Sequence, residues 1–236
     1  RIGGFYIPNL PLFIVAAHVL IGLLAAGDPS RLAPLMLIPQ KVAAEGEFHR
    51  LFSFIFVPGT LNLMLLVLFS YFFYFFASAA ENALGGFRFN LLFFGSAFGY
   101  VVAAGIFMLF PTAFPEGYYL PLSSHYLHMV VILAFCILFP KYEIYYMFVL
   151  RLEARWIGVI DALFIAHGFL FGTASDRVLI LCALGSFTVL FWNRCYTMVH
   201  NRFRRKKFQR DLREADPTEW DDEDDDEDED EEYDEY

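Results

Sequence analysis

Long apolar runs alternate with short polar breaks along most of this chain. Six runs have roughly the 20 residues that a helix needs to cross a bilayer, and they cover residues 10–26, 51–77, 87–109, 118–139, 156–171 and 178–198. A helix that is apolar on all sides needs lipid or a large core around it, and 236 residues cannot build six such cores. The pattern predicts an all-α, polytopic membrane protein with six transmembrane helices.

Composition agrees with a membrane protein, and the charge divides the chain into three parts. Hydrophobic residues make up 58% of the sequence, with 29 Phe and 13 Tyr, well above the share of a soluble domain. The net charge is −10, but 15 of the 27 acidic residues lie between 219 and 236. We therefore expect a membrane domain over 1–200, a basic juxtamembrane segment over 201–215, and an acidic tail over 216–236 that self-repulsion keeps disordered.

The basic segment follows the sixth apolar run directly. Such clusters bind anionic lipid headgroups, so we expect membrane lipids as partners of Arg202, Arg204, Arg205, Lys206 and Lys207. Charge alone also permits nucleic-acid binding, but the sequence offers no fold to support it, and we expect no nucleic-acid partner.

Basic residues near the helix ends indicate the orientation in the membrane. If the N-terminus is cytoplasmic, the inner segments hold 13 Lys and Arg and the outer segments hold 4. The positive-inside rule then places both termini in the cytoplasm, at the plasma membrane if the source is bacterial. The first apolar run lacks a basic leader, so we expect it to be part of the fold and not a cleaved signal. The three cysteines lie in or beside apolar runs, which favours buried small side chains over a disulfide or redox pair.

Four local patterns resemble the rhomboid superfamily, over most of residues 8–200. The stretch 37–51 resembles the lead into the second rhomboid helix, with Arg50 kept and His49 where Trp is usual. The other three patterns are Glu81 with Gly85 and Gly86 before the third helix, the connector from Phe139-Pro140 to Arg155-Trp156, and Leu184-Gly185 in the sixth helix. The stretch 54–59 ahead of Glu81 is also similar to derlins, an inactive branch of the superfamily. The resemblance implies a six-helix rhomboid-like bundle, in which Gly185 belongs to a small-residue stripe of the sixth helix that packs against the fourth.

Active rhomboids are intramembrane serine proteases that pair a serine of the fourth helix with a histidine of the sixth. An imidazole must act as base for the hydroxyl, which is otherwise a poor nucleophile. At the matching positions this chain has Ser124 or His125 in place of the nucleophile, Tyr126 in place of a glycine, and Ala183 in place of the histidine. The resemblance therefore implies a degenerate site without the catalytic dyad.

The remaining polar residues of the apolar runs are candidates for a groove or cavity. Ionisable groups inside a membrane are costly and often functional, and the candidates are Ser123, Ser124, His125, His128, Asp161 and His167. His125 and His128 share a helix face, but two histidines without a third ligand make a poor zinc site, so we expect no metal and no cofactor. We expect Asp161 to lie just inside the membrane interface, unpaired with His167, which is six residues further along the helix.

Three other polar residues have a structural interpretation. We expect Arg50 and Glu81 to anchor loops by hydrogen bonds to backbone carbonyls and amides. His18, in the first apolar run, is expected to be hydrogen-bonded within the bundle.

These observations favour a rhomboid-like pseudoprotease. As the resemblance implies, it would bind transmembrane segments of client proteins in a lateral groove between the second and fifth helices, or perturb the bilayer locally. The alternative is an active intramembrane serine protease that combines Ser123 or Ser124 with His128 or His167. A small transporter or channel is a third possibility, but the sequence has no inverted repeat and no paired broken helices.

Overall fold

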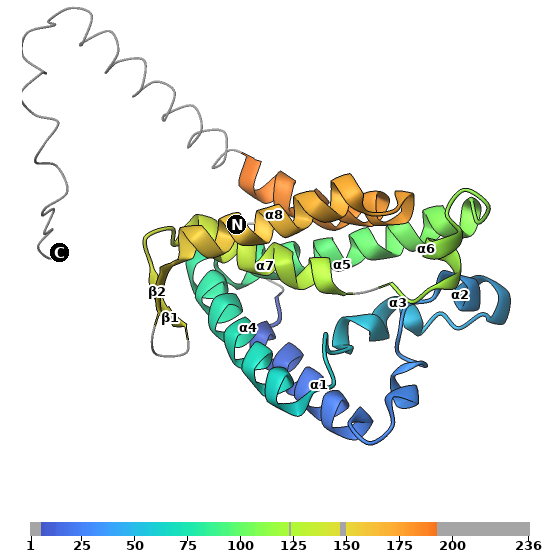
Figure 1. Ribbon diagram of the computed structural model, residues 1–236, viewed down its shortest axis with the longest axis horizontal. Helices are drawn as coiled ribbons and strands as arrows, with labels where there is room; N and C mark the ends of the chain where they lie inside the picture. Colours follow the sequence, from blue (N-terminus) through green and yellow to red (C-terminus); the bar gives the residue numbers. More distant parts are fainter. Residues whose placement is uncertain (1–5, 123, 147–149, 193–236) are drawn as a thin grey trace, which may run out of the picture. The chain divides into compact units, whose positions relative to one another are not determined.

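The computed structural model describes residues 6–122, 124–146 and 150–192. Contacts divide the chain after Leu190 into two units, and the description below concerns the first of them. The elements, labelled in Figure 1, are α1 (Leu10–Ala25), η1 (Pro29–Leu32), α2 (Pro39–Glu45), α3 (Arg50–Ser53), η2 (Phe54–Phe56), α4 (Leu63–Leu84), α5 (Gly86–Leu109), α6 (Pro115–Tyr119), α7 (His125–Leu138), β1 (Glu143–Tyr146), β2 (Leu150–Glu153) and α8 (Ala154–Phe171). A further helix, Ala174–Trp192, follows α8.

The structure is helical apart from one short hairpin. The strands β1 and β2 pair antiparallel, with Glu143 opposite Glu153 and Tyr146 opposite Leu150. The hairpin lies in the connector between α7 and α8, whereas the apolar runs predicted an all-α chain. The helical class is thus confirmed, with this addition.

Four helices in the described part of the chain are long and apolar enough to cross a membrane: α4, α5, α8 and Ala174–Trp192. The helices α1 and α7 are also apolar but shorter, with 16 and 14 residues. The coarse prediction of several apolar helices is therefore confirmed, and the structure is compatible with a multi-pass integral membrane protein. The predicted basic segment and acidic tail lie outside the described residues.

The second predicted helix has the wrong boundaries. The apolar run 51–77 predicted one helix, whereas the chain forms the short α3 and η2 and then leaves helical geometry before α4 begins at Leu63. Pro58 and Gly59 interrupt the run, because proline cannot supply a backbone amide to a helix. Asn62 then caps α4, since its Oδ1 accepts hydrogen bonds from the amides of Met64 and Leu65.

The fourth predicted helix is divided in a similar way. The run 118–139 contains Pro121, and the structure places α6 before this proline and α7 after it. The transmembrane candidate in this region is thereby reduced to the 14 residues of α7. In both runs hydropathy located the apolar segment, while proline set the helix boundary.

The connecting segments gather at two ends of the bundle. At one end, Leu37 forms an isolated β-bridge with Leu122, and the amide of Gly117 donates to the Ser175 hydroxyl over 3.0 Å. At the other end, the Asn90 side chain donates to the carbonyl oxygen of Ile7 over 3.2 Å. The segments before α1 and between α4 and α5 therefore lie together, and those after α1, α5 and α8 meet at the opposite end. This alternation is the one that helices running up and down between two ends require.

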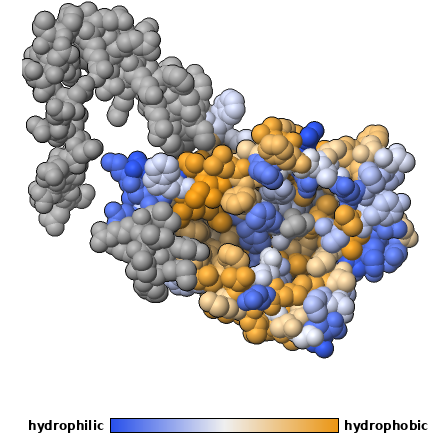
Figure 2. Space-filling view, viewed as in Figure 1, coloured by the Kyte–Doolittle hydropathy of each residue, from blue (hydrophilic) through white to orange (hydrophobic). Residues whose placement is uncertain are grey.

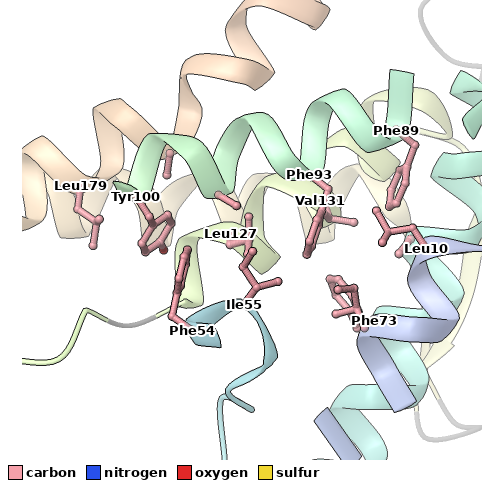
Figure 3. Close-up of a cluster of buried hydrophobic side chains, with 14 of the residues drawn as sticks. Leu10, Phe54, Ile55, Phe73, Phe89, Phe93, Tyr100, Leu127, Val131 and Leu179 are labelled. Carbon is pink, nitrogen blue, oxygen red and sulfur yellow. The ribbon is translucent and has the colours of Figure 1, made fainter. Parts of the chain in front are cut away.

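The buried core joins all of these helices. Figure 3 shows Leu10 of α1, Phe73 of α4, Phe93 of α5 and Val131 of α7 converging, with Leu179 at the opposite edge. Phe54 of η2 stacks on Tyr100 of α5 at a centroid distance of 5.3 Å. The connection from α1 to α4 thus returns into the bundle, where Phe54 packs inside it.

The outer surface of the helices is also apolar. Figure 2 shows broad hydrophobic areas on the face that it displays. Among the exposed side chains are Leu24 on α1, Met64 on α4, Phe98 on α5 and Phe171 on α8. Apolar patches of this extent on a soluble protein mark an interaction site or an aggregation hazard, whereas lipid is their natural solvent.

Candidate functional site

A cavity of about 390 Å³ lies among α1, α4, α7 and α8 and brings together several of the predicted polar residues. Its polar lining includes His18, Ser70, His125, His128 and Asp161. Pro58, Gly59 and Thr60, which precede α4, and aromatic and aliphatic side chains of α4 and α7 form the rest of the wall. A mostly apolar cavity with a few convergent polar groups is the usual form of a binding site, and we take it as the candidate site.

The helix α7 gives the cavity its position. It packs against both α4 and α8, whereas α4 and α8 are not a packed pair within the described chain. In Figure 1, α4 runs away from α7 and α8 toward α1. The cavity therefore occupies the space between α4 and α8, and α7 closes one side of this space.

Two histidines meet inside the cavity. His18 of α1 and His128 of α7 have ring centroids 5.1 Å apart, and the ring of Phe73 lies edge-on to His128 at 4.9 Å. His18 Nε2 donates to the carbonyl oxygen of Ile55 over 3.0 Å, as expected of a histidine bonded within the bundle. The His18 ring thus already donates a proton to a backbone carbonyl.

Asp161 is buried within the bundle. It is only 7% exposed and lines the cavity, and its place just inside the membrane interface stays a prediction. Its Oδ2 atom is buried without a hydrogen-bond partner in the described part of the chain. His167 of the same helix is exposed and its ring contacts Phe171, so the two residues occupy different faces of α8.

A second cavity, of about 360 Å³, lies on the other side of His125. Tyr126, Thr173, Ser175 and Asp176 are among its lining residues. The exposed His125 belongs to both cavities, at the N-terminus of α7. It is therefore the residue that separates the candidate site from the end of the bundle where α6 lies.

The positions that would hold a protease dyad have other partners. The Ser124 hydroxyl donates to the carbonyl oxygen of Val57 over 3.4 Å, so its hydrogen points toward a backbone acceptor that cannot act as a base. Ala183 is fully buried in the core of the bundle and has no ionisable group. Ser123 lies outside the described residues, as do the predicted lipid-binding residues Arg202 to Lys207. Within the described residues, no group of three His, Cys, Asp or Glu could hold a metal ion.

Arg50 anchors the loop after α1. The guanidinium is 2% exposed, and its Nη1 donates to the carbonyl oxygens of Ala33 and Met36, the latter over 2.8 Å. The two carbonyls between them also accept side-chain hydrogen bonds, from His49 and Ser53, at 3.0 and 2.9 Å. Four consecutive carbonyls are thus bonded to three residues around α3, and we call this group the loop clamp. The expected bonds of Arg50 to backbone carbonyls are present.

Glu47 completes the loop clamp on its solvent side. Its Oε2 accepts a hydrogen bond of 2.5 Å from Arg50 Nε. The bond to the Arg50 guanidinium holds the pKa of the Glu47 carboxyl below its ordinary value. The guanidinium therefore meets carbonyls on one side and a carboxylate on the other.

Glu81 performs a similar task at the opposite end of the bundle. Its carboxyl group accepts hydrogen bonds from the amides of Asn9 and Leu10, which are free because they begin α1. Gly85 follows with a φ of 80°, a backbone conformation that favours glycine. A Cβ atom on Gly86 would clash with the ring of Tyr6. The predicted Glu and Gly motif thus fixes the start of α1 against the turn from α4 to α5.

Gly185 does not make the helix contact that the resemblance implied. A Cβ atom on Gly185 would meet nothing within 4 Å. The close approach comes instead from α5, where a Cβ atom on Gly99 would clash with the backbone carbonyl of Cys182. One turn away, the hydroxyls of Ser96 and Ser186 are 2.6 Å apart. The small residues Gly99 and Ser96 of α5 thus allow this close contact.

No protein-family model matches this chain, and comparison with curated proteins and with solved structures gave no match either. The rhomboid resemblance therefore rests on the local patterns described above.

Sequence reasoning missed two residues of the site. His18 and Ser70 line the cavity, but neither was a groove candidate. His18 carried a usable signal, since an ionisable residue inside an apolar run is a functional candidate by default. Ser70 carried none, because serine commonly bonds its own helix backbone.

Proposed function

We propose that this chain is a catalytically inactive, rhomboid-like integral membrane protein. In this proposal it crosses the membrane six times with both termini in the cytoplasm, at the plasma membrane if the source is bacterial. It binds transmembrane segments of client proteins at the cavity between α4 and α8, or perturbs the bilayer there.

The cavity is the observation that carries this proposal. It is lined by α4 and α8 without close packing between these two helices, so a segment in the membrane could reach it from the side. Phe69 of α4 lines the cavity and is 57% exposed, which is expected of a residue at the rim of such an opening. The six-span topology is supported by the alternation of connecting segments between the two ends of the bundle.

The loss of proteolytic activity is supported by the partners of the candidate residues. Peptide hydrolysis needs a base close to the nucleophile, at about 3 Å. The Ser124 hydroxyl donates to Val57 instead, and the position expected to hold the base is Ala183.

Site-directed photo-crosslinking tests the binding proposal. A photoreactive residue replaces Phe69 in the full chain, reconstituted in vesicles with single-span peptides that have a leucine-rich host sequence and one variable polar residue. We expect crosslinks from position 69 to some of these peptides. Phe98, a phenylalanine of α5 that is 66% exposed, is the control and should give few. Equal yields at the two positions, or none at either, would contradict a client site between α4 and α8.

A serine-directed fluorophosphonate probe tests the alternative of an active protease. We expect no labelling of the purified protein in membranes. Labelling that disappears in Ser123→Ala or Ser124→Ala would restore the protease interpretation.

A further inference from the structure

The buried carboxyl group of Asp161 has unused hydrogen-bonding capacity. Its Oδ2 atom is without a partner in the described chain although the side chain is more than nine-tenths buried. A buried carboxylate that lacks a partner is costly, and an intramembrane position makes it more so. The free-energy cost of burying such a group is low only if another molecule supplies its missing partner.

Two imidazole rings line the same cavity as Asp161. His18 Nε2 donates to Ile55. Because the ring centroids of His18 and His128 are 5.1 Å apart, two imidazolium ions would repel each other, so at least one ring is neutral. A neutral imidazole that donates from one nitrogen keeps the other as an acceptor. The cavity therefore combines at least one imidazole acceptor with a carboxyl oxygen that has no partner in the described chain.

These requirements define the chemistry of the missing group. A lysine ammonium has three donors and no acceptor, and a guanidinium has five donors and no acceptor. Both carry the charge that complements a carboxylate. A metal ion fits less well, because the described residues include no group of three ligands.

We propose that the cavity recognises a basic side chain in the transmembrane segment of a client, with Asp161 as its counter-charge. This inference rests on the proposed function and specifies the class of client. The basic residue enters between α4 and α8, and its apolar stem lies along Phe69 and Phe73, as long cationic side chains commonly do.

Three single-span peptides test this inference on the full-length protein in lipid nanodiscs. They share one leucine-rich sequence and carry Lys, Leu or Glu at the same depth, and the depth is varied over three positions. Binding is measured by fluorescence transfer from a labelled peptide. We expect the Lys peptide to bind the protein at least about tenfold more tightly than the Leu peptide at the best depth, as a charge-assisted hydrogen bond allows.

Variants of Asp161 assign the preference to this residue. Asp161→Asn should reduce the Lys-over-Leu preference to about twofold or less, while Asp161→Glu, which keeps the charge, should retain more of it. Asp28→Asn is the matched control, because Asp28 lies in the exposed loop after α1, where its side chain bonds to Ser30. Thermal unfolding monitored by tryptophan fluorescence verifies that each variant is folded.

The outcomes separate the two proposals. If all three peptides bind with equal affinity, clients do bind but the basic residue is not recognised, and the inference fails alone. If no peptide binds, the proposed function fails and the inference fails with it. If a simple alkylamine binds in an Asp161-dependent way while the peptides show no preference, the cavity is a small-amine site and the inference is overturned.

Discussion

Two buried charged residues of this protein differ in how completely they are hydrogen-bonded. In the loop clamp, Arg50 is 2% exposed and its guanidinium bonds to two carbonyls and a carboxylate. In the cavity, Asp161 is 7% exposed and one of its oxygens has no partner in the described chain. Burial alone therefore does not distinguish a structural charge from a functional one. The completeness of the hydrogen bonding does, because a charge that holds a fold together has its partners within that fold.

Removing the Arg50 guanidinium should give the largest effect on stability. Arg50→Ala leaves two carbonyls and Glu47 without their donor, and we expect the free energy of unfolding to fall by about 3–5 kcal/mol. Arg50→Lys should recover little of this, since an ammonium cannot reproduce the planar fork of donors. Equilibrium unfolding in mixed detergent micelles measures the change.

Arg31→Ala is the control for that experiment. Arg31 is an exposed arginine of the same loop, 3.9 Å from Asp28, and exposed ion pairs contribute about 0–1 kcal/mol. Similar losses for the two arginine variants would mean that the loop clamp does not stabilise the fold.

Substitution of Asp161 should not lower the free energy of unfolding, in contrast to substitution of Arg50. Asp161→Leu removes a buried group that lacks a partner, so we expect unchanged or higher stability, by up to about 1–3 kcal/mol, together with loss of the preference for lysine-bearing peptides. Such an exchange of stability for function is common at binding sites.

Asp28→Leu provides the comparison within the same protein. Asp28 accepts hydrogen bonds from the Ser30 amide and hydroxyl at the start of η1, so we expect its loss to lower the free energy of unfolding. Substitutions of the two aspartates should therefore change the free energy of unfolding in opposite directions. A large destabilisation by Asp161→Leu would show instead that Asp161 is a structural residue.

The smallest expected effect is the pH dependence of the loop clamp. Because the Arg50 bond lowers the pKa of folded Glu47 below its ordinary value of 4.5, the unfolded chain takes up the proton first as pH falls. The contribution of Glu47 to stability is therefore present above pH 4.5 and is lost as pH falls through the lower folded pKa. Glu47→Gln should flatten this part of the stability profile between about pH 6 and pH 3, because the Glu47 carboxyl changes its protonation in this range.

Glu45→Gln, in the neighbouring α2, is the matched control for this measurement. Its profile over the same range should follow that of the unmodified protein. If the two glutamine variants behave alike, the Arg50–Glu47 bond does not contribute to the pH dependence.

The helical class and the anchoring residues could be predicted from the sequence. Apolar runs show the helices directly, and Arg50 and Glu81 stood at loop ends where backbone groups need partners. The errors fell where helix boundaries depend on single residues. Pro58 shortened the second predicted helix, because hydropathy summed over a long run does not register one proline.

The candidate site was predictable in its members but not in its arrangement. His128 and Asp161 were recognised as polar residues within apolar runs, yet their meeting in one cavity depends on α7 lying between α4 and α8. Sequence periodicity shows on which face of its own helix a residue lies. It does not show which other helix packs against that face. Ser124 illustrates the difference, since its partner Val57 lies in a non-helical stretch that the sequence had placed in a helix.

The length of α1 has a consequence for the surrounding lipid. Its 16 residues span about 24 Å at 1.5 Å per residue, whereas the hydrocarbon core of a typical bilayer is about 30 Å thick. In the proposed topology this difference is a hydrophobic mismatch, which a bilayer relieves by thinning beside the short helix. Thinning next to α1, which contributes His18 to the cavity, brings water closer to this site. A client lysine would then cross a thinner layer of hydrocarbon before it meets Asp161.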